Sequence, residues 1–128
     1  MTRMFVLLVF ACLCTLSVSC SSSDTPISTV EGVASLNGAA LSDCIVVFEN
    51  KEERVFVTAY TDEKGNFQSS KVVPGVFQVS IKPKPRYAEP NPGEVLVEVP
   101  ELYQSAATSG LKTTFVQGEN QYDVDLKQ

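Results

Sequence analysis

The sequence predicts an all-β protein, a seven- to eight-stranded antiparallel β-sandwich, and two features of the 128-residue chain support this prediction. Short segments in which apolar and polar residues alternate recur at spacings of about 10 to 15 residues. Turn sequences such as Asn-Gly, Asp-x-x-Gly and Pro-Gly separate these segments, and the periodicity of an amphipathic helix is absent from them. Roughly 100 residues are enough to bury one modest core between two sheets.

Residues 1–19 are predicted to be a helical signal peptide that is cleaved from the mature protein. Arg3 supplies the positive charge, Met4–Leu16 forms the apolar stretch, and small residues follow it. Such a stretch rises only about 20 Å as a helix, whereas a hydrocarbon core is roughly 30 Å thick. A permanent transmembrane helix is therefore the weaker interpretation.

The residues before Cys20 resemble the lipobox at which bacterial lipoproteins are cleaved and lipidated. Leu16 stands one residue earlier than the usual apolar position, which Ser17 occupies. The resemblance implies that Cys20 becomes the mature N-terminus and carries two or three acyl chains, enough for stable anchoring. The alternative is an ordinary secretory signal cut near Ser19, which would leave Cys20 as a free thiol.

Residues 20–27 are expected to form a lipidated, Ser-rich tether, and residues 28–128 a single domain. This arrangement predicts a membrane-anchored protein of the cell envelope. Ser21 follows the Cys where Asp would retain a lipoprotein in the inner membrane, so the enterobacterial sorting rule favours the outer membrane.

The domain is expected to contain alternating strands joined by short turns. Asn37-Gly38 is a strong hairpin signal, and Pro74-Gly75 presets a second turn. Pro100–Tyr103 is predicted to be one helical turn, followed by a loop of small residues over 104–110. The expected strands are Val30–Leu36, Cys44–Phe48, Val55–Thr61, a strand from Asn66, a strand through Phe77, Val79 and Ile81, an edge strand Val95–Val99, and a closing hairpin of Leu111–Val116 with Tyr122–Leu126.

Cys44 lies in an apolar run and is predicted to be a core residue, with its side chain on the same inward face as Val46 and Phe48. Lys82–Gly93 contains four prolines and is predicted to be a surface loop with extended character. Arg86 and Tyr87 in this loop are the candidate partner contacts. A plain crossover between the two sheets is the more favoured interpretation of the same loop.

Four spaced motifs occupy turn and core positions: Val30-x-Gly32-x-Ala34-x-Leu36-x-Gly38-x-x-Leu41, Val46-x-Phe48, Thr61-Asp62-x-x-Gly65-x-Phe67, and Pro74-Gly75-x-Phe77-x-Val79-x-Ile81. Together they resemble the carboxypeptidase regulatory-like domains, which are transthyretin-like (prealbumin-like) β-sandwiches. The C-terminal residues around Tyr103 and Gly118–Leu126 are similar to those of small lipoproteins abundant in planctomycete bacteria. The resemblance covers residues 28–128 and implies this fold. Its motifs imply little about activity, and Ala34 and Ala40 depart from the usual pattern.

The composition excludes several functions. The net charge of −5 lacks the basic face that nucleic-acid binding requires. The chain has no His, so zinc-peptidase chemistry and the Ser-His-Asp triad are excluded, as are the His-dependent transthyretin-like hydroxyisourate hydrolases. We expect no catalytic, cofactor-binding or metal-binding residues.

Two groups of polar residues could serve either chemistry or structure. Asp62, Glu63 and Asn66 lack the spacing of a calcium loop, and a β-turn capped by Asp62 is favoured. Asp123 and Asp125 alternate with core residues and are expected on a solvated strand face rather than in an active site.

The sequence therefore predicts a non-enzymatic, lipid-anchored envelope protein with a structural or binding β-sandwich. An alternative is a carbohydrate- or protein-binding accessory subunit of an envelope or export complex. The expected partners are the membrane, reached through Cys20, and an envelope protein or glycan.

Overall fold

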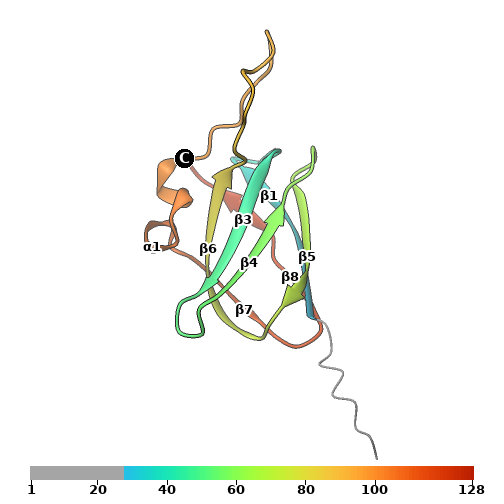
Figure 1. Ribbon diagram of the computed structural model, residues 1–128, viewed down its shortest axis with the longest axis vertical. Helices are drawn as coiled ribbons and strands as arrows, with labels where there is room; N and C mark the ends of the chain where they lie inside the picture. Colours follow the sequence, from blue (N-terminus) through green and yellow to red (C-terminus); the bar gives the residue numbers. More distant parts are fainter. Residues whose placement is uncertain (1–27) are drawn as a thin grey trace, which may run out of the picture.

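The computed structural model describes residues 28–128, which form two β-sheets packed face to face (Figure 1). The all-β sandwich predicted from the alternating segments is confirmed. The first sheet is built around β1 (Ser28–Leu36), which pairs on both sides. Its antiparallel neighbours are β2 (Ala39–Ala40) and β5 (Asn66–Val72), and its parallel neighbours are β8 (Glu119–Gln121) and β9 (Val124–Leu126).

The second sheet is wholly antiparallel. Its order is β4 (Val55–Tyr60), β3 (Cys44–Asn50), β6 (Gly75–Pro83) and β7 (Leu111–Phe115). The described residues therefore contain nine strands, more than the seven or eight expected. The count is higher because the last part of the chain forms two short strands, β8 and β9, and because the two-residue segment β2 counts as a strand.

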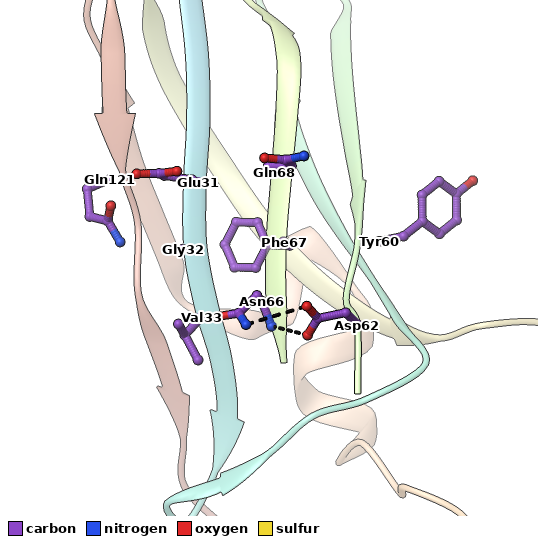
Figure 2. A pocket seen from close by; sticks show the side chains of 9 residues that line it. All are labelled: Glu31, Gly32, Val33, Tyr60, Asp62, Asn66, Phe67, Gln68 and Gln121. Carbon is purple, nitrogen blue, oxygen red and sulfur yellow. Dashed lines mark hydrogen bonds between the residues drawn. The ribbon is translucent and has the colours of Figure 1, made fainter. Parts of the chain in front are cut away.

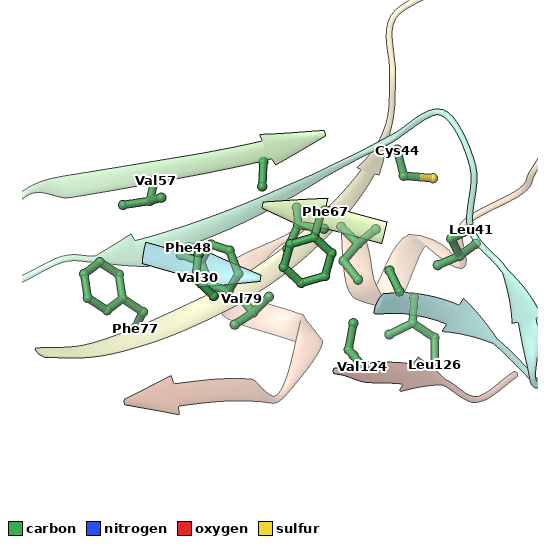
Figure 3. Close-up of a cluster of buried hydrophobic side chains, with 14 of the residues drawn as sticks. Val30, Leu41, Cys44, Phe48, Val57, Phe67, Phe77, Val79, Val124 and Leu126 are labelled. Carbon is green, nitrogen blue, oxygen red and sulfur yellow. The ribbon is translucent and has the colours of Figure 1, made fainter. Parts of the chain in front are cut away.

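The core lies between the sheets and follows the predicted alternation (Figure 3). Cys44, Val46 and Phe48 on β3 are no more than 1% exposed, as predicted. The ring of Phe48 meets Phe115 edge-on, with 5.0 Å between ring centroids, and Tyr122 at 5.7 Å. These contacts join β3 and β7 in the second sheet to the segment between β8 and β9, so the aromatic cluster ties the two layers together.

Gly32 lies where β1 approaches the segment that joins β8 to β9. A Cβ atom at this position would stand 1.7 Å from the carbonyl oxygen of Tyr122 and 2.9 Å from the Phe67 ring. Tyr122 N–H also donates to the Glu31 carbonyl across 2.9 Å, which holds the segment close. The sequence needs a glycine here because no other residue allows this approach.

The predicted closing hairpin of Leu111–Val116 with Tyr122–Leu126 is wrong. β7 pairs with β6, whereas β8 and β9 cross to the other sheet and pair with β1. Asn120 fixes this crossing: its Nδ2 donates to the Thr29 carbonyl at 3.0 Å, and its Oδ1 accepts from Val116 N–H at 2.9 Å. The chain therefore leaves the second sheet and attaches to the first.

The predicted edge strand Val95–Val99 is also wrong, since this segment pairs with no strand of residues 28–128. Val95 is 88% exposed, and only Val99 is buried in the core. Gln104 Nε2 donates to the Val99 carbonyl at 2.8 Å, which turns the chain into a helical segment instead of a ladder.

Two short helical elements follow. The predicted turn is the 3₁₀ helix η1 (Glu101–Gln104), and the predicted loop contains α1 (Ala106–Ser109). Ser105 Oγ accepts from Ala107 N–H at 3.3 Å, and Gly110 ends α1 with φ 68°. Among residues 28–128 no helix is long and apolar enough to span a membrane.

Candidate functional site

The most prominent surface feature is the proline arm, which we define as residues 84–96. It projects from one end of the sandwich, at the opposite end from Ser28, where the described chain begins (Figure 1). Lys82 and Pro83, predicted as loop, instead complete β6 and pair with Ile45 and Cys44. Proline is tolerated there because it stands at the strand end.

The proline arm is held together by Glu94. Its Oε1 accepts a hydrogen bond from Arg86 Nη1 at 2.6 Å, and its Oε2 accepts one from Asn91 N–H at 3.0 Å. These two donors, Arg86 first, lower the pKa of the Glu94 carboxyl group. Arg86 also lies 3.6 Å from Asp43 at the base of the arm.

The structure thus separates the two predicted contact residues. Arg86 is engaged in holding the two legs of the proline arm together. Tyr87 is 101% exposed. Tyr87 is therefore the member of the pair that a partner could contact, and its role remains a prediction.

A polar row crosses the outer face of the first sheet. Gln121 on β8, Glu31 on β1 and Gln68 on β5 are aligned by the strand register and lie side by side (Figure 2). They line a shallow, open concavity of about 550 Å³, with Tyr60 at its far rim. Amide and carboxylate groups in such a row can donate to and accept from hydroxyl groups. This row was not predicted from the sequence, although alternation along β1 places Glu31 outward.

Asp62 forms the capped turn that was predicted in preference to a calcium loop. Its Oδ1 accepts from the backbone N–H of Asn66 at 2.9 Å (Figure 2). The same oxygen accepts from Lys64 N–H at 2.8 Å, and Gly65 adopts φ 78°. The Asn66 backbone donor is the main cause of a lowered pKa at Asp62. No cluster of His, Cys, Asp and Glu within residues 28–128 could hold a metal ion.

Asp123 is exposed, as predicted, and its role is structural. Its Oδ1 accepts from Val33 N–H at 3.0 Å and from Gln121 Nε2 at 2.9 Å. The carboxylate therefore accepts the hydrogen bond of Val33 N–H on β1, in the gap between the end of β8 and the start of β9.

Asp125 is also exposed and binds several donors. The Lys127 ammonium, Gly38 N–H and the Ser35 hydroxyl lower its pKa to about 2, in that order of importance. The last two are hydrogen bonds of 3.0 and 2.9 Å. Asp125 thus fastens β9 to the hairpin that follows β1.

Cys44 is buried in the core, which confirms its predicted place. Burial, and then the negative charge of Asp43, raise the pKa of its thiol to about 11. A thiol with this pKa is almost entirely protonated at neutral pH and is a poor nucleophile. Tyr103 is likewise structural: its hydroxyl donates to the Lys127 carbonyl at 2.8 Å near the end of the chain.

Phe56 and Tyr60 were not identified as surface residues from the sequence. They are 64% and 60% exposed on the outer face of β4, while Val57 and Ala59 are buried. The alternation of inward and outward positions along Val55–Tyr60 is the signal that would have found them. Cys20, the predicted lipidation site, lies outside the described residues, as do the predicted signal peptide and tether.

Comparison with known proteins adds little. No family model matches the chain, and no curated protein matches it. Among solved structures, the pilus adhesin RrgA from Streptococcus pneumoniae is similar over 51% of this chain, with 22% sequence identity and a TM-score of 0.36. The similar region is 8% of the adhesin chain.

Proposed function

We propose that this protein is a non-enzymatic, lipid-anchored cell-envelope protein whose β-sandwich serves a structural or binding role. The observation that carries the proposal is the apolar leader that ends in Ser19-Cys20 and is followed by a Ser-rich segment. The outer membrane is the location favoured by Ser21. We also propose that residues 28–128 are of the transthyretin-like, carboxypeptidase regulatory-like kind. The motif residues on which that resemblance rests lie in turns and in the core of the sandwich, as this fold requires.

The arrangement of the domain is compatible with anchoring at its N-terminal end. The described chain begins at Ser28, and the proline arm with its exposed Tyr87 lies at the other end of the sandwich (Figure 1). A tether that enters at Ser28 leaves the arm and the polar row of Figure 2 uncovered. Both surfaces therefore stay accessible to a partner in the envelope.

The lowered pKa values of three carboxyl groups favour a structural role for them over acid–base catalysis. Asp62, Glu94 and Asp125 all have lowered pKa values, each caused by hydrogen-bond donors of the fold itself. A general acid requires the opposite shift, a carboxyl group whose pKa is raised toward neutrality. These three carboxylates are suited to holding turns and loops.

Replacing the predicted lipidation site tests the anchor. Cys20→Ser should move the protein from the membrane fraction to the aqueous fraction, because a single serine cannot carry the thioether-linked acyl chains. Cys44→Ser is the matched control, since it changes another cysteine and should leave fractionation unchanged. Retention of Cys20→Ser in carbonate-washed membranes would contradict the proposal.

A binding role as an accessory subunit, with a glycan as one class of ligand, is favoured by the polar row. Glu31, Gln68 and Gln121 offer aligned donors and acceptors, and Tyr60 at the rim offers an aromatic face on which a sugar ring could stack. Pull-down from detergent-solubilised envelopes should then return a stoichiometric glycan or protein. The double variant Gln68→Ala, Gln121→Ala should lose it, whereas Lys112→Ala on the other sheet should not.

A further inference from the structure

β4 forms one edge of the second sheet, and its outer side is unpaired within residues 28–128. It pairs with β3 on one side, and within residues 28–128 no strand pairs with its other side. An open edge of this kind presents unpaired N–H and C=O groups to any other extended chain. Proteins commonly protect such edges with a charged residue, a proline or a bulge.

β4 lacks these protections, whereas every outer strand of three or more residues besides β4 has a charged residue; the uncharged outer strand β2 has only two residues. Its six residues, Val-Phe-Val-Thr-Ala-Tyr, include no charge and no proline. By contrast, β5, β7, β8 and β9 contain Lys71, Lys112, Glu119 and Asp125, all exposed. The edge that lacks a charge also displays Phe56 and Tyr60.

The free backbone groups of β4 belong to its exposed residues. Thr61 N–H, at the end of the strand, donates to the Cys44 carbonyl across 2.9 Å and therefore points toward β3. In an antiparallel ladder alternate residues point the same way, so Phe56, Thr58 and Tyr60 direct their N–H and C=O groups away from β3. A strand added at this edge would pair with these three residues.

We propose that two copies of this chain associate through β4, antiparallel, about a two-fold axis at Thr58. In this register Thr58 faces Thr58 of the other copy, and Phe56 faces Tyr60 twice, once on each side of the axis. Beyond the strand ends, Arg54 comes opposite Asp62, so charges of opposite sign meet. The two four-stranded sheets would then join into one continuous sheet of eight strands.

The sequence of β4 is self-complementary, which favours one register and a second copy of this chain as the partner. After a shift by one residue, residues with outward-pointing N–H and C=O groups would face residues whose N–H and C=O groups point toward β3. The ladder of hydrogen bonds could not form. A shift by two would place Phe56 opposite Thr58 and Arg54 opposite Tyr60, which loses the aromatic and charged pairs. Only a second copy supplies these matches without a further partner, because an isologous contact uses the same patch twice.

The association does not depend on the lipid anchor, but it constrains the anchor's geometry. Antiparallel pairing sends the two Ser28 ends in opposite directions. The eight residues 20–27 reach at most about 28 Å when fully extended. Both copies can therefore attach to one membrane when the joined sheet lies along its surface.

Disulfide trapping tests the register directly. In the full-length protein in detergent, Thr58→Cys should form a covalent dimer under mild oxidation, because paired strand residues have Cα atoms about 5.5 Å apart, within the range for a disulfide. Lys71→Cys on the edge of β5 is the control and should give no more dimer than wild type. Thr58→Cys that stays at the wild-type level would overturn the proposal.

A charge exchange at the axis provides a second, independent measurement. Thr58→Lys and Thr58→Asp each place like charges face to face, so each variant should sediment as a monomer while its circular dichroism stays that of wild type. Mixing the two variants should restore the dimer through a Lys–Asp pair. A wild-type protein that sediments as a monomer at micromolar concentration, or a mixture that stays monomeric, would contradict the two-fold contact at Thr58.

Discussion

Three carboxylates hold the loops and ends of this small sandwich. Asp62 caps the turn between β4 and β5, Glu94 joins the legs of the proline arm, and Asp125 fastens β9 to the hairpin after β1. All three have pKa values lowered by the donors that surround them. Acid should therefore loosen the molecule at these three points first.

Asp125→Asn tests this acid sensitivity. The folded-state pKa of about 2 lies below the ordinary value of 3.8, so the Asp125 charge stabilises the fold above about pH 4, and this stabilisation is lost as the pH falls toward 2. The variant should melt at a lower temperature than wild type at pH 7, and the two melting temperatures should converge toward pH 2. Melting curves that stay a constant distance apart across this range would show that the Asp125 charge contributes nothing.

Gly32→Ala should destabilise the domain strongly. The new Cβ atom would overlap the Tyr122 carbonyl oxygen and the Phe67 ring, so the β8–β9 segment would have to move away from β1. We expect a loss of about 2–4 kcal/mol in the free energy of unfolding by denaturant titration. Glu31→Ala, at the exposed neighbouring position, should change it by no more than about 0.5 kcal/mol. A Gly32→Ala domain as stable as this control would contradict the close approach.

The inward residues of β1, β3 and β6 were predictable because period-two alternation depends on local sequence alone. Gly65 and Asn37-Gly38 were predictable for the same reason: their positive φ values belong to short turns with known residue preferences. Asn120 was not, because its significance arises from a bond to Thr29, which is 91 residues away in sequence. The crossing of the last strands to the first sheet depends on that bond and on Thr29 N–H, which donates to the Gly118 carbonyl.

The proline arm behaves as an element in its own right. Its residues 84–96 are all exposed, and its two legs are joined by the Arg86–Glu94 and Asn91–Glu94 hydrogen bonds. Alternating valines predicted an edge strand at Val95–Val99, but the segment around Pro90 and Pro92 leads the chain away from the sheet, and Pro100 ends any extension. The exposed state of Tyr87 was predictable from the prolines around it, whereas the internal pairing of Arg86 was not.

Glu94→Gln tests the internal order of the proline arm. Loss of the ion pair should free the arm, so chymotrypsin should cleave after Tyr87 several-fold faster than in wild type. The melting temperature should change little, because ion pairs between exposed side chains contribute little to stability. Glu89→Gln, an exposed change in the same arm, should leave the cleavage rate as in wild type. Equal rates for both variants would show that Glu94 does not order the arm.

Within residues 28–128, two candidate binding surfaces lie apart from the residue at which the described chain begins. The chain enters the sandwich at Ser28, the proline arm lies at the far end, and the polar row of Glu31, Gln68 and Gln121 lies on the first sheet. The proposed β4 contact lies on the second sheet, so pairing of two copies leaves the polar row itself uncovered. Anchoring and association can therefore occur in the same molecule with the polar row free, whereas Tyr60 is shared between the β4 contact and the rim of the concavity.

The intact mass of the mature protein shows whether a lipid at Cys20 holds this sandwich at a membrane. We expect a chain that begins at Cys20 and carries a diacylglyceryl group, with or without an N-acyl chain. Alkaline hydrolysis of the two ester-linked acyl chains should lower the mass by one fatty acid less one water for each chain. An unmodified chain, or one that begins at any residue other than Cys20, would rule out the proposed anchor.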